Sequence, residues 1–264
     1  MPLTAEHVSH AYRRGEPGET LALDSIDLTI NEGQLVLLAG ANGSGKSTLL
    51  HCLSGLLRPS SGKVSFDGLA SLSIQFPERA LFAATVYDDI AFGPLNAGMK
   101  KDEARARALE AAGRAGLDKE LLGRHPRTLS HGQRRLAALA GVIAMRPRYL
   151  LLDEPTAGLD PTAKGRIAEA LVRLNREGMA VVVASHDLAH FLGICGRVIV
   201  ISHGRIVFDG GPEGLVSLED TASISLPPSL VVARWLREKG IEAPWDISPE
   251  DAAARARRIH EGLD

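Results

Sequence analysis

Residues 40–48 read Gly-Ala-Asn-Gly-Ser-Gly-Lys-Ser-Thr, directly after the apolar run Leu35–Ala39 and at the start of a predicted helix, Ser47–Leu57. The spacing fits the pattern Gly-x-x-x-x-Gly-Lys-Ser/Thr between a strand and a helix. Glycines allow backbone N–H groups to curl around a phosphate, and the helix N-terminus adds its positive dipole end. The stretch therefore predicts a phosphate-binding loop in an α/β fold, rather than a turn that merely connects two elements.

The polar residues of this loop have predicted roles in binding a nucleotide. Lys46 would contact the β- and γ-phosphates, and the Ser47 hydroxyl would ligate Mg²⁺. Thr48 would add a hydrogen bond to a phosphate. The rest of the loop would surround the phosphates through its backbone, at Asn42, Gly43, Ser44 and Gly45.

Short apolar runs elsewhere in the chain predict the sheet that carries the loop. Runs without alternation suggest strands covered on both faces, as in a parallel sheet. Leu3–Tyr12 and Leu21–Ile30 alternate more and predict antiparallel strands at one edge, while Ile206–Asp209 predicts the second arm of a hairpin. The predicted parallel strands are Gln34–Ala39, Lys63–Asp67, Tyr149–Leu152, Ala180–Ala184 and Val198–Ser202.

Helices are predicted in two further parts of the chain. Lys100–Ala115 is rich in Ala, Arg, Lys and Glu, and Gly132–Met145 ends before a proline, so a helical block interrupts the sheet. Near the C-terminus, Ser229–Lys239 and Pro249–His260 predict two more helices, the second with Pro in its first turn. These two helices look like an appendage to the α/β core.

Composition excludes several classes of protein. The chain has 264 residues, 45% of them hydrophobic and 23% charged, and a formal net charge of −2. No overall basic field would recruit nucleic acid, and the two cysteines have neither metal-ligand nor disulfide-scaffold spacing. The longest nearly apolar run, Leu136–Met145, is about half of a membrane span. We therefore expect a cytosolic protein whose membrane role, if any, is peripheral.

An acidic pair, Asp153-Glu154, closes the apolar strand Tyr149–Leu152. The carboxyl end of a parallel strand delivers such side chains beside the phosphate loop. Asp153 would hold Mg²⁺ through its water shell, and Glu154 would polarise the attacking water. Alone, such a pair is as often a helix cap, but behind a complete phosphate loop the catalytic interpretation is favoured.

A second set of motifs identifies a family. Residues 128–133, Thr-Leu-Ser-His-Gly-Gln, closely resemble the Leu-Ser-Gly-Gly-Gln signature of ATP-binding-cassette (ABC) ATPases. The resemblance covers about residues 3–211. It implies a P-loop NTPase core over residues 1–211 with an antiparallel β edge and an inserted helical signature subdomain at about 79–147, followed by the appendage at 212–264. The other motifs follow in the family's order: Gln75 after a strand, Asp153-Glu154-Pro155, Ala157-Gly158-Leu159-Asp160 and Ser185-His186-Asp187.

The resemblance implies further site residues. Tyr12 stands at the position of the aromatic that stacks on adenine, and Gln75 matches the glutamine that touches Mg²⁺ and the attacking water. His186 matches the histidine that senses the γ-phosphate, and Asp160 matches the aspartate that crosses the dimer interface. Taken in isolation, each has another interpretation: a surface tyrosine, a polar strand end, a structural histidine and a helix cap.

The signature predicts a dimer. Because Ser130 begins a helix, free N–H groups there form a second anion site, which one nucleotide does not need from the same chain. The family resolves this by head-to-tail dimerisation, in which Ser130, Gly132 and Gln133 of one subunit cover ATP on the other. His131 stands where the family usually has glycine, and its side chain could either crowd the γ-phosphate or donate to it.

Residues 75–94 narrow the family further. They resemble the ATPases of energy-coupling-factor (ECF) importers for vitamins, cobalt or nickel, although Ala80 stands where many have glutamine. The resemblance implies an ATP- and Mg²⁺-dependent ATPase on the cytoplasmic face of the membrane, paired with itself or a related ATPase. Leu81 and Phe82 would help to receive a helix of the membrane subunits. The other interpretation of Leu81, Phe82 and Phe92 is ordinary core.

Other function classes fit less well. An ATPase of another class of ABC transporter would share every motif of the phosphate site. A non-transport ABC ATPase acting on DNA or ribosomes would normally bring tandem cassettes or a coiled-coil insertion, and no nucleic acid partner is expected. A kinase with the same loop would have no use for the signature.

Overall fold

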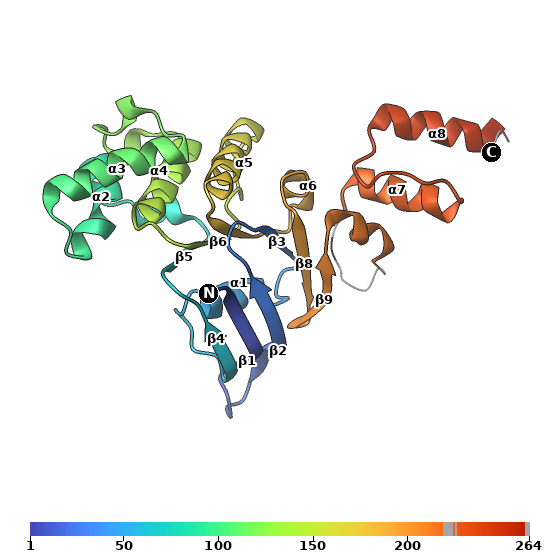
Figure 1. Cartoon of the computed structure of the whole chain (residues 1–264), viewed down its shortest axis with the longest axis horizontal. Helices are drawn as coiled ribbons and strands as arrows, with labels where there is room; N and C mark the ends of the chain where they lie inside the picture. Colours follow the sequence, from blue (N-terminus) through green and yellow to red (C-terminus); the bar gives the residue numbers. More distant parts are fainter. Residues whose placement is uncertain (219–223, 225, 262–264) are drawn as a thin grey trace.

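Six strands form the sheet at the centre of the molecule (Figure 1). The structure is a computed structural model that describes residues 1–218, 224 and 226–261. Neighbouring strands are parallel except for the last two, which form an antiparallel hairpin. In spatial order the strands are β5 (Ala70–Ser73), β6 (Tyr149–Asp153), β7 (Ala180–Ala184), β3 (Leu35–Ala39), β8 (Arg197–Ser202) and β9 (Arg205–Gly210).

Both faces of this sheet are buried, as the unbroken apolar runs predicted. Along β3, Leu35 and Leu37 join one hydrophobic cluster, whereas Val36 and Leu38 join the cluster on the opposite face. Successive side chains of a strand point to opposite faces, so only a run without alternation can fill two cores. The buried sheet therefore holds the loops at the carboxyl ends of its strands in fixed positions.

A separate antiparallel sheet has the order β2-β1-β4 and consists of β1 (Leu3–Tyr12), β2 (Thr20–Ile30) and β4 (Ser61–Ser65). With α1 (Lys46–Leu53) it covers one face of the parallel sheet. The antiparallel N-terminal strands are confirmed, but they form a sheet of their own rather than an edge of the parallel one.

The prediction of a parallel strand at Lys63–Asp67 was wrong. β4 pairs antiparallel with β1, with Val64 opposite Ala5, and its side chains are exposed or half-buried. A segment that alternates Lys, Ser and Asp with single apolar residues cannot fill two cores. The edge of the parallel sheet is β5 instead, the strand that precedes Gln75.

A helical block separates β5 from β6. It contains α2 (Val86–Asn96), α3 (Lys101–Ala115) and α4 (His131–Ala144), with 3-10 turns at Pro77–Ala80, Lys119–Leu121 and Pro126–Thr128. Gly116 takes the left-handed conformation that ends α3. On the other face of the parallel sheet, α5 (Pro161–Arg176) and α6 (Leu188–Phe191) pack on the strands. The predicted helices at 100–115 and 132–145 are thus present within one residue.

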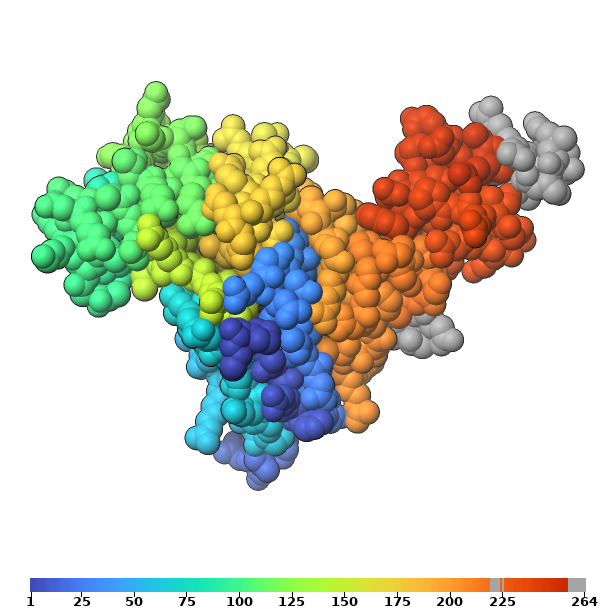
Figure 2. Space-filling view, viewed as in Figure 1, coloured from blue at the N-terminus to red at the C-terminus, as the bar shows by residue number. Residues whose placement is uncertain are grey.

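The C-terminal segment contains a 3-10 turn at Pro212–Ser217 and the helices α7 (Pro228–Glu238) and α8 (Pro249–Glu261), close to their predicted bounds. Residues 219–223, 225 and 262–264 of the predicted appendage lie outside the described residues. Figure 2 shows α7 and α8 projecting from the end of the molecule opposite the helical block. Among the described residues, no helix has the length and hydropathy of a membrane span.

Candidate functional site

Four neighbouring parallel strands end at the same edge of the central sheet, and each carries a motif there. β3 leads into the phosphate loop, β6 ends at Asp153, β7 leads to His186, and β5 leads to Gln75. The backbone joins the loops directly, because Ser185 N–H donates to the Leu38 carbonyl over 3.1 Å. The fold thus gathers at one edge the residues that sequence reasoning took from four separate motifs.

Two glycines give the phosphate loop its shape. Gly40 has φ +150° and Gly45 has φ +110°, and a Cβ on either would lie within 2.6 Å of a backbone carbonyl oxygen. Ser44 Oγ is buried, with no hydrogen-bond partner among the described residues. A tight backbone curl with a buried hydroxyl turned into it is a suitable cradle for phosphate oxygens.

Lys46 brings a cation to this cradle. It is 6% exposed, and its Nζ donates to the carbonyls of Gly40 and Ala41 over 2.8 and 3.0 Å. Burial lowers the pKa of Lys46, while the carboxylates of Glu154 and Asp153 act in the opposite direction. The ammonium therefore lies in the field of the acidic pair and beside the loop that would hold phosphates.

The backbone of Glu154 has φ +48°, a conformation that non-glycine residues seldom adopt outside functional sites. Its carboxylate accepts hydrogen bonds from His186 N–H at 3.0 Å and Ser185 Oγ at 3.2 Å, and His186 Nδ1 lies at 2.7 Å. Because an ionised carboxylate only accepts, Nδ1 carries the proton of this contact. Glu154 is 9% exposed, and the His186 side chain is 61% exposed. A fixed carboxylate thus lies beside an accessible imidazole.

Tyr12 lies beside the helix that follows the phosphate loop. Its hydroxyl is 3.2 Å from Thr48 Oγ1, and its ring meets His10 edge to face with centroids 4.8 Å apart. The side chain is 44% exposed, so a flat group could lie against it. Tyr12 belongs to β1 of the antiparallel sheet, yet its position suits a nucleotide base next to the phosphates.

The residues predicted to ligate Mg²⁺ come from three elements of this edge. Asp153 is 8% exposed at the end of β6, whereas Ser47 and Gln75 are exposed. Gln75 is followed by Phe76, whose φ of +57° turns the chain sharply towards the helical block. No group of three His, Cys, Asp or Glu side chains suited to a metal ion occurs within the described ranges. A hydroxyl, an amide and a carboxylate offer oxygen ligands, the type that Mg²⁺ takes together with water and phosphate oxygens.

The signature residues lie at the N-terminus of α4. Ser130 and Gln133 form a capping box, in which Ser130 Oγ accepts from Gln133 N–H and Gln133 Oε1 accepts from Ser130 N–H. An added Cβ on Gly132 would lie 2.7 Å from Ala163 Cβ, and Asp160 Oδ1 caps α5 at Ala163 N–H. Two helix N-termini thus line one small cavity of about 130 Å³.

The signature and the phosphate loop are not joined within the chain. In the part of the chain that the structure describes, no hydrogen bond or ion pair links Ser130, Gly132 or Gln133 to residues 40–48. The signature and the phosphate loop therefore lie in separate parts of the fold, at α4 and at the end of β3.

Two contacts at the site were not foreseen from the sequence. Ser185, fully buried, donates to Glu154, and Lys164 Nζ lies 2.7 Å from Asp187 Oδ2. The hydrogen bond from Lys164 holds the pKa of Asp187 below its ordinary value. The sequence motifs contain Glu154 and Asp187, but their partners lie 31 and 23 residues away, and spacing alone cannot identify such pairs.

An apolar groove of about 630 Å³ lies where the helical block meets the edge of the parallel sheet. Phe82 and Phe92 are 66% and 43% exposed, and their rings meet edge to face with centroids 4.8 Å apart. Leu81, by contrast, is half-buried and packs partly against the core. The remaining large apolar side chains of the groove are Leu56, Leu69, Leu72, Ile74, Val142 and Met145.

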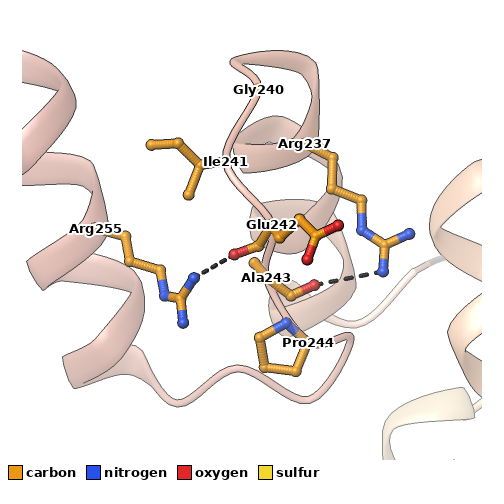
Figure 3. Close-up of a pocket in the computed structure, with 7 residues that line it drawn as sticks. All are labelled: Arg237, Gly240, Ile241, Glu242, Ala243, Pro244 and Arg255. Atoms are coloured by element: carbon orange, nitrogen blue, oxygen red, sulfur yellow. Dashed lines mark hydrogen bonds between the residues drawn. The ribbon is translucent and has the colours of Figure 1, made fainter. Parts of the chain in front are cut away.

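A further cavity, about 740 Å³, lies away from these motifs in the C-terminal segment (Figure 3). Arg237 donates to the Ala243 carbonyl and Arg255 to the Glu242 carbonyl, both in the loop between α7 and α8. Both guanidinium groups therefore stabilise that loop. None of the residues predicted to bind a nucleotide lines this cavity.

Comparisons with known proteins identify the family of the chain. The sequence pattern of the ABC transporter family matches residues 23–157. The ECF transporter ATP-binding protein EcfA2 of Symbiobacterium thermophilum is 40% identical over 276 residues, spanning 98% of this chain and 96% of its own. A putative ABC transporter ATP-binding protein of Methanosarcina mazei is 37% identical over 275 residues, spanning 100% of this chain and 95% of its own.

Solved structures give the same result. The cbiO1 protein of Clostridium perfringens, part of the ABC transporter complex cbiONQ, superposes with a TM-score of 0.75 and 33% identity over 90% of this chain and 94% of its own. The cassette MJ0796, in a dimeric post-hydrolysis state bound to ADP and Pi, superposes with a TM-score of 0.69 and 29% identity over 79% of this chain and 98% of its own. The resemblance and the fold class stated from the sequence are thereby confirmed, and the chain belongs to the ABC transporter family as an ATP-binding protein.

Proposed function

We propose that this chain hydrolyses ATP to power a membrane importer of the ECF type, for a metal ion or a vitamin. The observation that carries the proposal is that neighbouring strands end at one sheet edge, where β3 leads to the glycine loop and Lys46 and where Glu154 contacts His186. The names of the relatives EcfA2 and cbiO1 support the importer assignment. The transported substrate would bind the membrane subunits.

Each residue at the edge has a role in this reaction. Lys46 would bind the β- and γ-phosphates, with residues 42–45 and Thr48 surrounding them, and stabilise the charge that develops on transfer. Glu154 would orient and polarise the attacking water, which the fixed carboxylate suits. The exposed imidazole of His186 would contact the γ-phosphate, and Tyr12 would stack on adenine.

Mg²⁺ fits the oxygen groups of this edge. Ser47, Gln75 and Asp153 offer a hydroxyl, an amide and a buried carboxylate, the hard ligands that Mg²⁺ takes together with water and phosphates. When bound, the ion would neutralise charge on the phosphate oxygens. The carboxylate of Asp153 would fix its position relative to the phosphate loop.

A head-to-tail dimer would complete each site. Ser130, Gly132 and Gln133 of one subunit would cover ATP held by the other, and Asp160 would cross the interface beside them. The capping box supports this, because Ser130 Oγ accepts from Gln133 N–H and keeps its own hydrogen for a phosphate oxygen. The partner would be a second copy or a related ATPase, with no nucleic acid involved.

The apolar groove would receive a helix of a membrane subunit at the cytoplasmic face. A helix-in-groove contact needs a few exposed apolar anchors, which the exposed rings of Phe82 and Phe92 provide. In this division, residues 1–211 form the nucleotide-binding domain, with the helical subdomain at about 79–147. Residues 212–264 form the appendage.

Phosphate release by the purified chain with ATP and Mg²⁺ tests the proposed activity. Lys46→Ala should abolish hydrolysis and weaken ATP binding, because it removes the cation that faces the β- and γ-phosphates. Lys63→Ala, which removes an exposed lysine of β4, serves as the matched control and should keep wild-type turnover. Full activity of the Lys46 variant would rule out the phosphate-loop assignment.

A further inference from the structure

Glu78 is the centre of a charged cluster that joins the loop after Gln75 to the signature helix. Its side chain is only 5% exposed and belongs to the 3-10 turn Pro77–Ala80. Oε1 lies 2.8 Å from His131 Nε2, and Oε2 lies 3.1 Å from Arg135 Nε. His131 and Arg135 are one turn apart at the start of α4, so a single carboxylate holds both. We call these three side chains the Glu78 cluster.

Arg135 extends the cluster to a third loop. Its Nη2 donates to the Ala157 carbonyl over 3.1 Å, in the segment between Glu154 and Asp160. The guanidinium is 2% exposed; burial lowers the pKa of Arg135, and the carboxylate of Glu78 acts in the opposite direction. Since a buried charge without a partner is costly, Glu78 is fixed in place by Arg135.

The residue directly after Gln75 belongs to the same assembly. The Phe76 ring lies under the guanidinium groups of Arg79 and Arg135, at 4.6 and 5.7 Å from the ring centroid. Phe76 also has the left-handed backbone that turns the chain towards the helical block. The position of Gln75 is therefore tied, through two residues, to the first turns of α4.

The imidazole of His131 is directed at Glu78. The sequence left two alternatives for this side chain, crowding of a γ-phosphate or donation to it, and the contact with Glu78 fits neither. The side chain is 42% exposed, so its removal leaves no buried cavity. A glycine, the usual residue of the family at this position, has no side chain to make the bond.

We propose that His131 is a positioning residue, which holds the loop of Gln75 against the signature helix so that Gln75 and Ser130 of one subunit move together when the dimer closes. The proposal rests on the proposed ATPase function. In this role His131 does not contact the nucleotide. It contributes to turnover only through its contact with Glu78.

Measuring ATP binding and turnover in variants of His131 distinguishes the positioning role from a general effect on folding. The phosphate loop is untouched in His131→Gly, so the Kd for a fluorescent ATP analogue should equal that of the wild type. The maximal rate kcat should fall by about tenfold or more, the size expected for the loss of one polar contact with a buried carboxylate. His131→Gln should recover most of the wild-type kcat, because its amide still donates to Glu78.

A double-mutant cycle with Glu78→Gln identifies the partner. In the Glu78→Gln background, His131→Gly should cause little further loss of kcat, since the ionised acceptor is already gone. Thermal unfolding of each variant checks folding. If Glu78→Gln does not fold, the contrast between His131→Gly and His131→Gln decides the question alone.

Three results would overturn the positioning role. They are a kcat of His131→Gly equal to or above that of the wild type, an equally low kcat in His131→Gln, and a full additional loss in the Glu78→Gln background. An inactive wild-type protein would contradict the proposed function and the positioning role together. An active wild type with a fully active His131→Gly would contradict the positioning role alone.

Discussion

At the scale of single residues, the phosphate loop depends on glycines that no other residue can replace. Gly45 combines φ +110° with a close approach to the β2 backbone, where an added Cβ would lie 2.5 Å from the Ala22 carbonyl oxygen. That oxygen belongs to the antiparallel sheet, so the loop is pressed between the two sheets of the core. The nearest atom is a backbone oxygen, which cannot move aside as the end of a flexible side chain could.

Gly45→Ala should therefore destabilise the protein by more than about 1 kcal/mol and weaken ATP binding, because alanine is strained at positive φ and meets a carbonyl. Gly113→Ala is the matched control: Gly113 lies in α3 and an added Cβ meets nothing within 4 Å. It should stabilise the fold by about 0.5–1 kcal/mol. Equal melting temperatures for the two variants in thermal unfolding would contradict the tight packing of the loop.

At the scale of elements, the groove between the helical block and the sheet edge is the candidate for coupling to a membrane subunit. The sequence left Leu81, Phe82 and Phe92 open between groove and core. The structure separates them, since the two phenylalanines are exposed and Leu81 packs partly on the core. Hydropathy could not separate exposed from buried side chains in this segment, because it does not show which side chains point towards the core.

Replacing both Phe82 and Phe92 by Ala should release the membrane subunits while ATP binding persists. Apolar anchors of an interface commonly cost more than about 1 kcal/mol each when truncated, and the phosphate loop is untouched. Thermal stability should change little, because both rings are exposed. Leu109→Ala, at an exposed leucine of α3 outside the groove, is the control for lost surface apolar area. Intact co-purification with a large loss of melting temperature would place both rings in the core.

The elements also show what the sequence could predict. β3, β6, β7 and β8 follow from unbroken apolar runs, and α3 and α4 follow from helix formers with clear ends. Lys63–Asp67 was assigned to the wrong sheet because a five-residue run does not record its pairing partner. The Glu78 cluster was not foreseen, since its members lie 53 and 57 residues apart in the chain and a buried arginine has no periodicity of its own.

At the scale of the whole molecule, the phosphate loop and the signature belong to different elements of one chain. Residues 40–48 and the N-terminus of α4 are held by different parts of the fold, and no hydrogen bond or ion pair of the described residues spans them. From the helix that begins at Ser130 and from the family's signature, the sequence predicted a second anion site and therefore a dimer. The sequence could not supply the contacts that connect the loop of Gln75 to α4, which run through Phe76 and Glu78.

Glu154→Gln in the presence of ATP and Mg²⁺ tests most directly whether Glu154 drives ATP hydrolysis in a site completed by a second subunit. The amide keeps the shape of the carboxylate and loses the base, so turnover should fall by about 100-fold or more. Bound ATP should then accumulate, and the variant should elute from a sizing column as a dimer with ATP and as a monomer without it. A variant that hydrolyses ATP at the wild-type rate, or that stays monomeric in saturating ATP and Mg²⁺, would contradict the claim.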